Sequence, residues 1–263
     1  MKEFFDITLL SVLQGVAEFL PISSSGHLVI GQSVLGMNAP GIRLDVFLHV
    51  GTVIAIFAFY RERVWKLLTG LFSRDLEARR ESWLYAVKIV VSALPAVVVY
   101  FIFRQRIEEF FENRKMVGAL LMFTGAVLMS TRFLPRGMKS VSVFRALAMG
   151  VGQAVALLPG VSRSGMTLAT ARGARISPEA SAEFSFLMST PLILGAAFLE
   201  VLKGVGGEVA AGEPSWGLVA YGAVLAAVVG YFSLMWLVKV LKGRFFWAFG
   251  PYCIVVGLLT VCL

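Results

Sequence analysis

Long runs of apolar residues, separated by short charged segments, dominate this chain. A helix needs about 17–25 mainly apolar residues to cross a bilayer. Six runs of that length are predicted to be transmembrane helices: 43–60, 83–103, 116–131, 181–202, 216–238 and 245–262. The runs lack the alternation that is typical of transmembrane β-strands. Because backbone groups in lipid must be hydrogen-bonded internally, the pattern predicts an all-α polytopic membrane protein with about six transmembrane helices.

Two further apolar segments, 5–36 and 144–175, are interrupted in the middle by proline, glycine and a cluster of serines. A break of this kind at membrane depth is tolerated only where protein buries it or where it lines a cavity. We therefore predict that each segment is a re-entrant helical hairpin whose break lies inside the protein.

The two interrupted segments also resemble each other in sequence. Offset by 139 residues, the stretch 14–26 lies over 153–165 without a gap, and six of the thirteen positions are identical. Each hairpin precedes three predicted spans, so the two halves have opposite orientations, as in inverted-repeat membrane proteins. The prediction is a single membrane domain over 1–263, with a first repeat at 1–135 and an inverted second repeat at 136–263.

Composition supports this class of protein. Hydrophobic residues make up 58% of the chain and charged residues 15%, with a mean hydropathy of +0.81, whereas soluble proteins carry about 25% charged residues. The net charge of +8 comes from basic residues between the apolar runs, and such residues mark cytoplasmic loops. We predict that 61–82, 132–145 and 239–244 face the cytoplasm, and that 104–115, 203–215 and both termini lie outside.

The positive charge does not indicate a nucleic-acid-binding protein, because no module of basic and aromatic surface residues is present. Cys253 and Cys262 both lie in the last apolar run, without the spacing of a zinc site or a disulfide framework. They are interpreted as small apolar fillers. The first residues lack the features of a cleaved signal peptide.

Candidate chemistry lies at the two breaks. Each break leads into a predicted helix, through Ser-Ser-Ser-Gly-His at 23–27 and Ser-Arg-Ser-Gly at 162–165. The first turn of a helix has free N–H groups and a positive dipole end, which suit a phosphate, and glycine lets the backbone approach a ligand closely. The predicted phosphate-binding residues at the breaks are Ser23, Ser25, Gly26, Ser162, Arg163, Ser164 and Gly165.

Simpler interpretations exist for these residues. Serine is a good helix N-cap, which accounts for one serine at each break but not for five hydroxyls. Arginine in a membrane protein often extends toward the interface. Arg163, however, lies in the middle of an interrupted apolar segment, and its planar group offers paired donors to phosphate oxygens. We favour the phosphate-binding role.

Glu18 lies four residues after Gln14, so both side chains share one helix face. Its neighbours in sequence are apolar, and a carboxylate in such surroundings must be paired, protonated or bound to a metal. We predict that Glu18 and Gln14 bind a divalent cation that bridges to the phosphates of a substrate. The alternative is a structural ion pair between Glu18 and Arg163.

The chain has two histidines. His27 begins a predicted helix three residues after Ser24, and either His27 or Glu18 is expected to deprotonate that serine as a general base. A structural role is the alternative for His27. His49 has no polar cluster around it in the sequence and is interpreted as structural. Asp45 fits a pocket-lining position and an interface position equally well.

The two serine-rich stretches carry a resemblance to a known family. Gln14 and Glu18, followed by Phe-Leu-Pro-Ile-Ser-Ser-Ser-Gly-His, resemble the (Glu/Gln)-x-x-x-Glu region of the undecaprenyl-diphosphate phosphatases, the bacitracin-resistance family. Residues 159–165, Pro-Gly-Val-Ser-Arg-Ser-Gly, with Thr167 after them, resemble that family's Pro-Gly-x-Ser-Arg-Ser-Gly-x-Thr motif. The likeness extends to chain length, span pattern and motif order. Many members have glutamate at the position of Gln14, so this chain has one charge fewer there.

The resemblance implies a homodimer of subunits built from inverted repeats. It also implies that Ser24 is the nucleophile, with His27 as its partner and Glu18 as an essential acid. The implied cofactor is a divalent cation, Mg²⁺ or Ca²⁺. The residues that match the phosphate-binding segment are Ser162, Arg163, Ser164 and Thr167.

The resemblance therefore implies hydrolysis of undecaprenyl diphosphate to undecaprenyl phosphate and inorganic phosphate. It also implies that the reaction recycles the lipid carrier for cell-wall synthesis and confers bacitracin resistance. The resemblance places the protein in the bacterial inner membrane, with its site open to the periplasmic side. Attack by Ser24 through a phosphoserine and direct attack by water both remain open. The alternative function is a polyprenyl-phosphate transporter or flippase, which needs Arg163 but not Ser24 with His27.

Overall fold

The computed structural model describes residues 1–36, 42–206 and 214–262. Within these residues the regular structure is helical, apart from one isolated bridge between Lys139 and Ile176. The helices, in chain order, are α1 (Lys2–Ala17), α2 (Ser24–Val34), α3 (Ile42–Phe59), α4 (Arg61–Gly70), α5 (Leu76–Glu112), α6 (Arg114–Ser130), η1 (Thr131–Phe133), α7 (Val143–Val155), α8 (Arg163–Gly173), α9 (Pro178–Gly206), α10 (Trp216–Lys242), η2 (Phe246–Ala248) and α11 (Phe249–Cys262).

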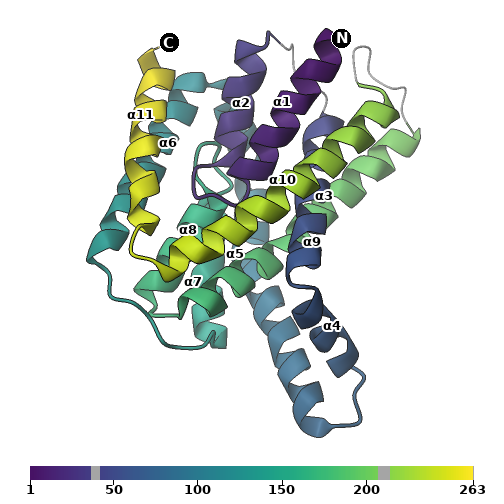
Figure 1. Cartoon of the computed structure of the whole chain (residues 1–263), viewed down its shortest axis with the longest axis vertical. Helices are drawn as coiled ribbons and strands as arrows, with labels where there is room; N and C mark the ends of the chain where they lie inside the picture. Colours follow the sequence, from purple (N-terminus) through teal and green to yellow (C-terminus); the bar gives the residue numbers. More distant parts are fainter. Residues whose placement is uncertain (37–41, 207–213, 263) are drawn as a thin grey trace.

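Two pairs of short helices occupy the segments predicted to be hairpins. α1 and α2 pack against each other and are joined by irregular residues 18–23, and α7 and α8 do the same around residues 156–162. Both chain termini lie on one side of the molecule, whereas α4 and the start of α5 project from the opposite end (Figure 1). This arrangement agrees with the predicted topology, and the side that faces the cytoplasm stays a prediction.

Within the described part of the chain, four helices are long and apolar enough to cross a membrane, namely Leu76–Glu112, Arg114–Phe133, Pro178–Leu199 and Trp216–Lys242. A fifth span results if α3 is counted together with α4, from which it is bent by 81°. The predicted span 245–262 is shorter, because a 3-10 turn precedes the 14 residues of α11. The protein is thus an all-α, multi-pass membrane protein, and its described residues contain four or five full-length spans where six were predicted.

Two segments predicted as loops are helical instead. Residues 61–70 form α4, and residues 104–112 continue α5 so that only Asn113 separates it from α6. On α5, Arg104 pairs with Glu108 and Arg106 with Glu109, and such pairs one turn apart stabilise a helix in water. At roughly 55 Å, α5 is longer than a bilayer core of about 30 Å. Its charged ends therefore extend beyond the membrane without ending the helix.

The predicted outer loop 203–215 is only partly described. α9 continues to Gly206, and residues 207–213 lie outside the described residues. Residue Ser215 caps the start of α10, because its side chain accepts a hydrogen bond from the N–H of Leu218. The cap explains why α10 begins at Trp216.

Small residues allow the helices to pack closely. A Cβ at Gly118 of α6 would lie 2.7 Å from the carbonyl oxygen of Gly257 on α11, and one at Gly125 would lie 2.6 Å from that of Gly250. Membrane helices use small residues in this way because lipid gives them no hydrophobic driving force to associate. The α6–α11 pair therefore depends on glycine at these contacts.

The helix contacts bear on the two predicted repeats. α1 packs on α10, and α7 packs on α5, which are corresponding pairs if α1 matches α7 and α5 matches α10. The division of the chain at residue 135 stays a prediction.

Packing next to the first break holds its backbone in place. Phe19 is fully buried, and its ring lies edge-on to Phe186 of α9, with the ring centroids 5.4 Å apart. A Cβ at Gly230 of α10 would lie 2.7 Å from the Phe19 ring. Phe19 is thus wedged between two spans, which determines where the neighbouring residue, Glu18, lies.

Candidate active site

The two breaks lie against each other. A Cβ at Gly26 would lie 3.1 Å from Cα of Gly160, and the Ser164 hydroxyl donates a hydrogen bond to the Leu20 carbonyl at 3.1 Å. A Cβ at Gly165 would lie 3.5 Å from Cβ of Pro21. The predicted meeting of the hairpins is therefore present, and it brings the start of α2 next to the start of α8.

Glu18 is the centre of the polar cluster at this junction. Its Oε1 forms an ion pair with Nη2 of Arg163. Its Oε2 accepts hydrogen bonds from Nε2 of Gln14 at 3.1 Å and from Oγ of Ser24 at 2.7 Å. The carboxylate is buried, and a buried charge is stable only when it is paired and hydrogen-bonded. Glu18 therefore contacts Gln14, on the same helix face as predicted, and also forms the ion pair with Arg163 that was the alternative interpretation.

Arg163 has unused hydrogen-bonding capacity in this cluster. Among the residues that the structure describes, Nη1 of Arg163 is buried without a hydrogen-bond partner, and so is Oε1 of Gln14. Unsatisfied buried polar atoms are costly and call for an explanation. One guanidinium nitrogen binds Glu18 while the other is free, so Arg163 is able to hold an anion without releasing the carboxylate.

Two of the serines at the breaks cap helices, and Ser24 contacts Glu18 instead. Ser23 and Ser162 cap α2 and α8, because their hydroxyls accept hydrogen bonds from the N–H groups of Gly26 and Gly165 at 3.2 and 3.0 Å. Ser24 is half-buried and donates to Glu18. The capping interpretation thus holds for one serine at each break, as expected, and leaves Ser24 as the hydroxyl poised for chemistry.

The backbone at Ser23 is strained. Its φ of 70° lies in the left-handed region, which residues other than glycine rarely adopt. Such conformations persist where the surroundings over-determine them, and they cluster at functional sites. This conformation lets Ser23 cap α2 while the next residue, Ser24, is directed at Glu18.

Three predicted phosphate-binding residues form hydrogen bonds to other groups of the protein. Ser164 donates to Leu20, and the Thr167 hydroxyl lies 2.8 Å from the Arg163 carbonyl oxygen and 2.6 Å from Oγ of Ser185. Ser162, Ser164 and Thr167 are all almost completely buried. In this structure they shape the second break, and direct contact of their side chains with a phosphate stays a prediction.

His27 does not contact Ser24 in the structure, contrary to the predicted pairing. Its Nδ1 lies 2.9 Å from the carbonyl oxygen of Ser23 and its Nε2 lies 2.8 Å from the hydroxyl of Tyr252. A carbonyl oxygen only accepts, so Nδ1 carries a hydrogen and donates it to the Ser23 carbonyl. Both ring nitrogens are occupied, and the group that accepts the Ser24 hydrogen bond is Glu18.

His49 lies beside the polar cluster, contrary to the surroundings expected from the sequence, and its predicted structural role stays a prediction. Nε2 of His49 lies 3.5 Å from Oε2 of Glu18, and its Nδ1 lies 2.7 Å from the carbonyl oxygen of Asp45. The Asp45 carboxylate accepts hydrogen bonds from Nε2 of Gln32 at 3.0 and 3.2 Å. No spacing rule links residue 49 to residue 18, because the contact depends on how α3 packs on the first hairpin.

Thr124 is a second residue that sequence reasoning missed. On α6, its hydroxyl donates to the carbonyl oxygen of Gly160 at 2.9 Å and accepts from the N–H of Ser162 at 3.1 Å. These two backbone groups belong to the irregular residues of the second break, where no helix satisfies them. One threonine thus holds the loop that positions Arg163.

We expect Thr124→Val to destabilise the protein by about 2–4 kcal/mol, because two buried backbone groups lose their partner at about 1–3 kcal/mol each. Thermal unfolding in detergent measures the effect, and Thr124→Ser, which keeps the hydroxyl, serves as the control and should unfold near the wild-type temperature. Equal unfolding temperatures for Thr124→Val and the wild type would show that the hydroxyl does not hold the break.

The residues present satisfy part of what a divalent cation requires. Among residues 1–36, 42–206 and 214–262, no three His, Cys, Asp or Glu side chains gather as a metal-ion site. Mg²⁺, however, is usually held by one or two carboxylates together with substrate phosphates and water. Glu18 and the unpaired Oε1 of Gln14 lie together and fit a cation that arrives with a diphosphate.

Comparisons with known proteins agree along the whole chain. Residues 7–259 match the family model described as "Bacitracin resistance protein BacA". Similar proteins, each named "Undecaprenyl-diphosphatase", include one from Rhodopirellula baltica, 37% identical over 267 residues and covering 100% of this chain and 99% of the relative. Another, from Halothermothrix orenii, is 34% identical over 264 residues and covers 99% and 98%. A third, from Methanosphaera stadtmanae, is 32% identical over 282 residues and covers 100% and 99%.

Proposed function

This chain belongs to the bacitracin resistance protein BacA family, and from this premise we propose that it hydrolyses undecaprenyl diphosphate to undecaprenyl phosphate and inorganic phosphate. The observation that carries the proposal is the contact between Oγ of Ser24 and Oε2 of Glu18 at 2.7 Å, beside Arg163. Phosphoryl transfer requires a hydroxyl next to a carboxylate base, together with a positively charged donor such as the Arg163 guanidinium.

Ser24 acts as the nucleophile in this reaction. Glu18 accepts the proton from Oγ of Ser24 as the oxygen forms a bond to the terminal phosphorus. The bond from that phosphorus to the bridging oxygen breaks, and undecaprenyl phosphate leaves with the bonding electrons. Water then cleaves the phosphoserine, which gives inorganic phosphate and returns a proton to Ser24. Direct attack by a water held by Glu18 is the alternative, and it gives the same products.

Arg163 and the first turn of α8 hold the diphosphate. Nη1 of Arg163 has no hydrogen-bond partner among the described residues, and the N–H groups at the start of α2 and α8 add a positive dipole end at the same place. Preorganised donors act most strongly where water is excluded, because charge that spreads over phosphate oxygens is then stabilised without reorganisation. The meeting of the two breaks supplies such a place inside the protein.

We include a divalent cation in this site. Glu18 and Oε1 of Gln14 would hold it, and when bound it would neutralise charge on the phosphate oxygens. Glutamine in place of a second carboxylate removes a charge from its ligands, which lowers affinity for a hard cation.

The experiment that tests the function is release of inorganic phosphate from undecaprenyl diphosphate by the purified protein in detergent, with and without a chelator. Phosphate release that the chelator abolishes and Mg²⁺ or Ca²⁺ restores supports both the hydrolysis and the cation. Binding of the lipid without phosphate release would contradict the hydrolysis and favour a carrier. Release that a chelator leaves unchanged would contradict the cation alone.

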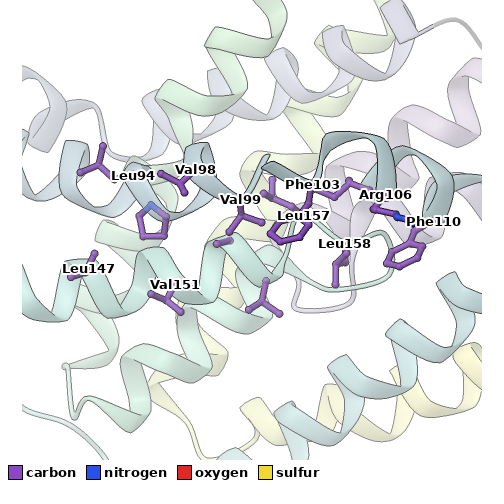
Figure 2. Close-up of a pocket in the computed structure, with 14 residues that line it drawn as sticks. Leu94, Val98, Val99, Phe103, Arg106, Phe110, Leu147, Val151, Leu157 and Leu158 are labelled. Atoms are coloured by element: carbon purple, nitrogen blue, oxygen red, sulfur yellow. The ribbon is translucent and has the colours of Figure 1, made fainter. Parts of the chain in front are cut away.

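An apolar groove beside the second hairpin is our candidate for the polyprenyl tail. The groove has a volume of about 730 Å³ between α5 and α7, and its lining is apolar except for Arg106. Leu157 and Leu158, which precede the phosphate-binding stretch, lie at the end of the groove near Arg106 and Phe110 (Figure 2). Each buried methylene contributes about 0.8 kcal/mol, so even a short length of tail adds appreciable affinity.

Filling this groove is expected to weaken binding of long substrates more than short ones. Val151 lies in the groove, and Val151→Trp should raise KM for undecaprenyl diphosphate about 10-fold, the equivalent of about 1.4 kcal/mol, and change KM for a fifteen-carbon diphosphate less. Val224→Trp, at a lipid-facing position on α10, is the control and should leave both values unchanged. An unaltered KM for the long substrate would show that the tail does not bind in the groove, which membrane lipid would then fill.

Location and assembly follow from the family as parts of the same proposal. We place the protein in the bacterial inner membrane as a homodimer, with the site open to the periplasmic side, where both termini also lie. Labelling of single cysteines at the ends of the chain in intact cells measures the side, and crosslinking in membranes measures the assembly.

A further inference from the structure

We propose that His49 is a positioning residue for Glu18, which it holds in the orientation that receives the Ser24 proton. The inference rests on the proposed phosphatase function. It concerns a residue that lies on α3, outside both hairpins and both serine-rich stretches. The observation behind it is the 3.5 Å separation between Nε2 of His49 and Oε2 of Glu18, the same oxygen that Ser24 contacts.

The ring of His49 is oriented by its own helix. Nδ1 lies 2.7 Å from the carbonyl oxygen of Asp45, one turn earlier in α3. Because a carbonyl oxygen only accepts, Nδ1 carries a hydrogen and donates it there. This contact directs the opposite edge of the ring, with Nε2, at the carboxylate of Glu18.

Nε2 therefore lies next to Oε2 of Glu18, and this contact restrains the carboxylate from the side of α3. The separation of 3.5 Å is at the long end for a hydrogen bond, and catalytic contacts are commonly long in the free enzyme and shorten when substrate binds.

Glu18 needs a contact besides Arg163, because Arg163 also binds the diphosphate in the proposed reaction. Nη2 of Arg163 pairs with Oε1 of Glu18, while Nη1 has no hydrogen-bond partner among the described residues. A diphosphate bound at Nη1 makes the guanidinium shared between the substrate and Glu18. His49 approaches the other carboxylate oxygen from a different helix, so it keeps Glu18 directed at Ser24 while Arg163 is shared.

His27 is unable to perform this task. Both of its ring nitrogens are bound, one to the Ser23 carbonyl and the other to the Tyr252 hydroxyl. His49 has one nitrogen directed at Glu18, and 28% of its side chain is exposed. Of the two histidines, His49 is thus the one that acts on the carboxylate.

The test compares His49→Ala with His49→Gln in phosphate release from undecaprenyl diphosphate. We expect His49→Ala to lower kcat roughly 10- to 100-fold, the scale of misplacing a reacting group by about 1 Å, with KM changed less than about threefold. Glutamine keeps an N–H donor of similar reach, so His49→Gln should recover most of kcat. A purely structural role would not produce this split between kcat and KM or this recovery.

Ile54→Ala is the matched control, because Ile54 lies on the same helix with 53% of its surface exposed. It should retain wild-type kcat. Wild-type kcat in His49→Ala would overturn the inference, and so would an equal loss in His49→Ala and His49→Gln. An equal loss in Ile54→Ala would attribute the effect to disturbance of α3 and would overturn it as well.

A second readout separates this inference from the proposed function. The infrared difference between the wild type and Glu18→Gln isolates the carboxylate band of Glu18. This band should shift in His49→Ala, stay near the wild-type frequency in His49→Gln, and be unaffected by Ile54→Ala. An unshifted band in His49→Ala would overturn the contact. Absence of phosphate release by the wild type would overturn the proposed function alone, since the infrared result would still decide the contact.

Discussion

Replacing Arg163 with alanine should lower kcat/KM for phosphate release by about 10³- to 10⁵-fold, the range for removal of an arginine that stabilises transferring phosphoryl charge. Two losses combine in this variant. The diphosphate loses the donor Nη1, which is free in the structure, and Glu18 loses its ion-pair partner. Measurement of kcat and KM on undecaprenyl diphosphate in detergent gives the magnitude.

The same substitution should also destabilise the protein. Glu18 is buried, and removal of one partner from a buried ion pair costs about 3–5 kcal/mol because the other charge is left uncompensated. Thermal unfolding of Arg163→Ala should therefore occur well below the wild-type temperature. The double variant Arg163→Ala with Glu18→Gln removes both charges and should recover much of the stability without recovering activity.

Arg163→Lys is the matched control for the geometry of the donors. Lysine keeps the charge, and so most of the stability, but it lacks the planar pair of donors that spans Glu18 and a phosphate. Its activity should lie between those of the wild type and Arg163→Ala. Activity of Arg163→Ala within tenfold of the wild type would contradict the placement of the substrate at this junction.

Ser24→Ala is expected to lower kcat by about 10⁴- to 10⁶-fold. Losses of this size occur when an enzyme loses a nucleophile that works together with its base. The fold should be little affected, because the change removes one hydrogen bond to Glu18, about 1 kcal/mol. The loss should thus appear in phosphate release while thermal unfolding stays near the wild-type temperature.

The neighbouring serine provides the comparison. Oγ of Ser25 lies 3.3 Å from Oγ of Ser23, and Ser25→Ala should lower kcat less than tenfold. Acid quenching during turnover should trap phosphate on the wild-type peptide that contains Ser24 and not on that of Ser24→Ala. Substantial phosphate release by a correctly folded Ser24→Ala would show that water is the attacking group, and Glu18 would then act as its base.

The local pattern of residues was sufficient to predict the apolar helices and the two breaks. Continuous apolar runs indicate spans in any tertiary arrangement, because lipid requires an internally bonded backbone of a certain length. The serine and glycine clusters at 23–26 and 162–165 indicate breaks, because serine caps helices and glycine permits close approach. Both breaks are present, and their caps are Ser23 and Ser162.

Helix ends were predicted less well. The charged residues at 104–112 were predicted to be a loop because the helix was expected to end with the apolar run. In the structure, α5 continues through them. Apolarity determines where a helix lies in lipid, and it does not determine where the helix stops. The end depends on caps and pairs such as Arg104 with Glu108, which are available to a helix in water.

The polar cluster shows the same division between local pattern and tertiary structure. Gln14 and Glu18 share a helix face by spacing alone, and Arg163 is an evident candidate partner. Nothing along the chain, however, shows that His49 approaches Glu18, that Thr124 holds the second break, or that Tyr252 occupies His27. His49 and Glu18 are 31 positions apart in the sequence, Thr124 and Gly160 are 36 apart, and Tyr252 and His27 are 225 apart.

The sequence by itself determined that the protein is a helical membrane protein with two broken hairpins and a set of groups able to bind phosphate, because periodicity, capping and chemical type are properties of neighbouring residues. Only the tertiary structure decided which base faces Ser24 and which histidine faces that base. Side-chain partners across helices depend on how the helices pack, and that packing is a property of the whole chain.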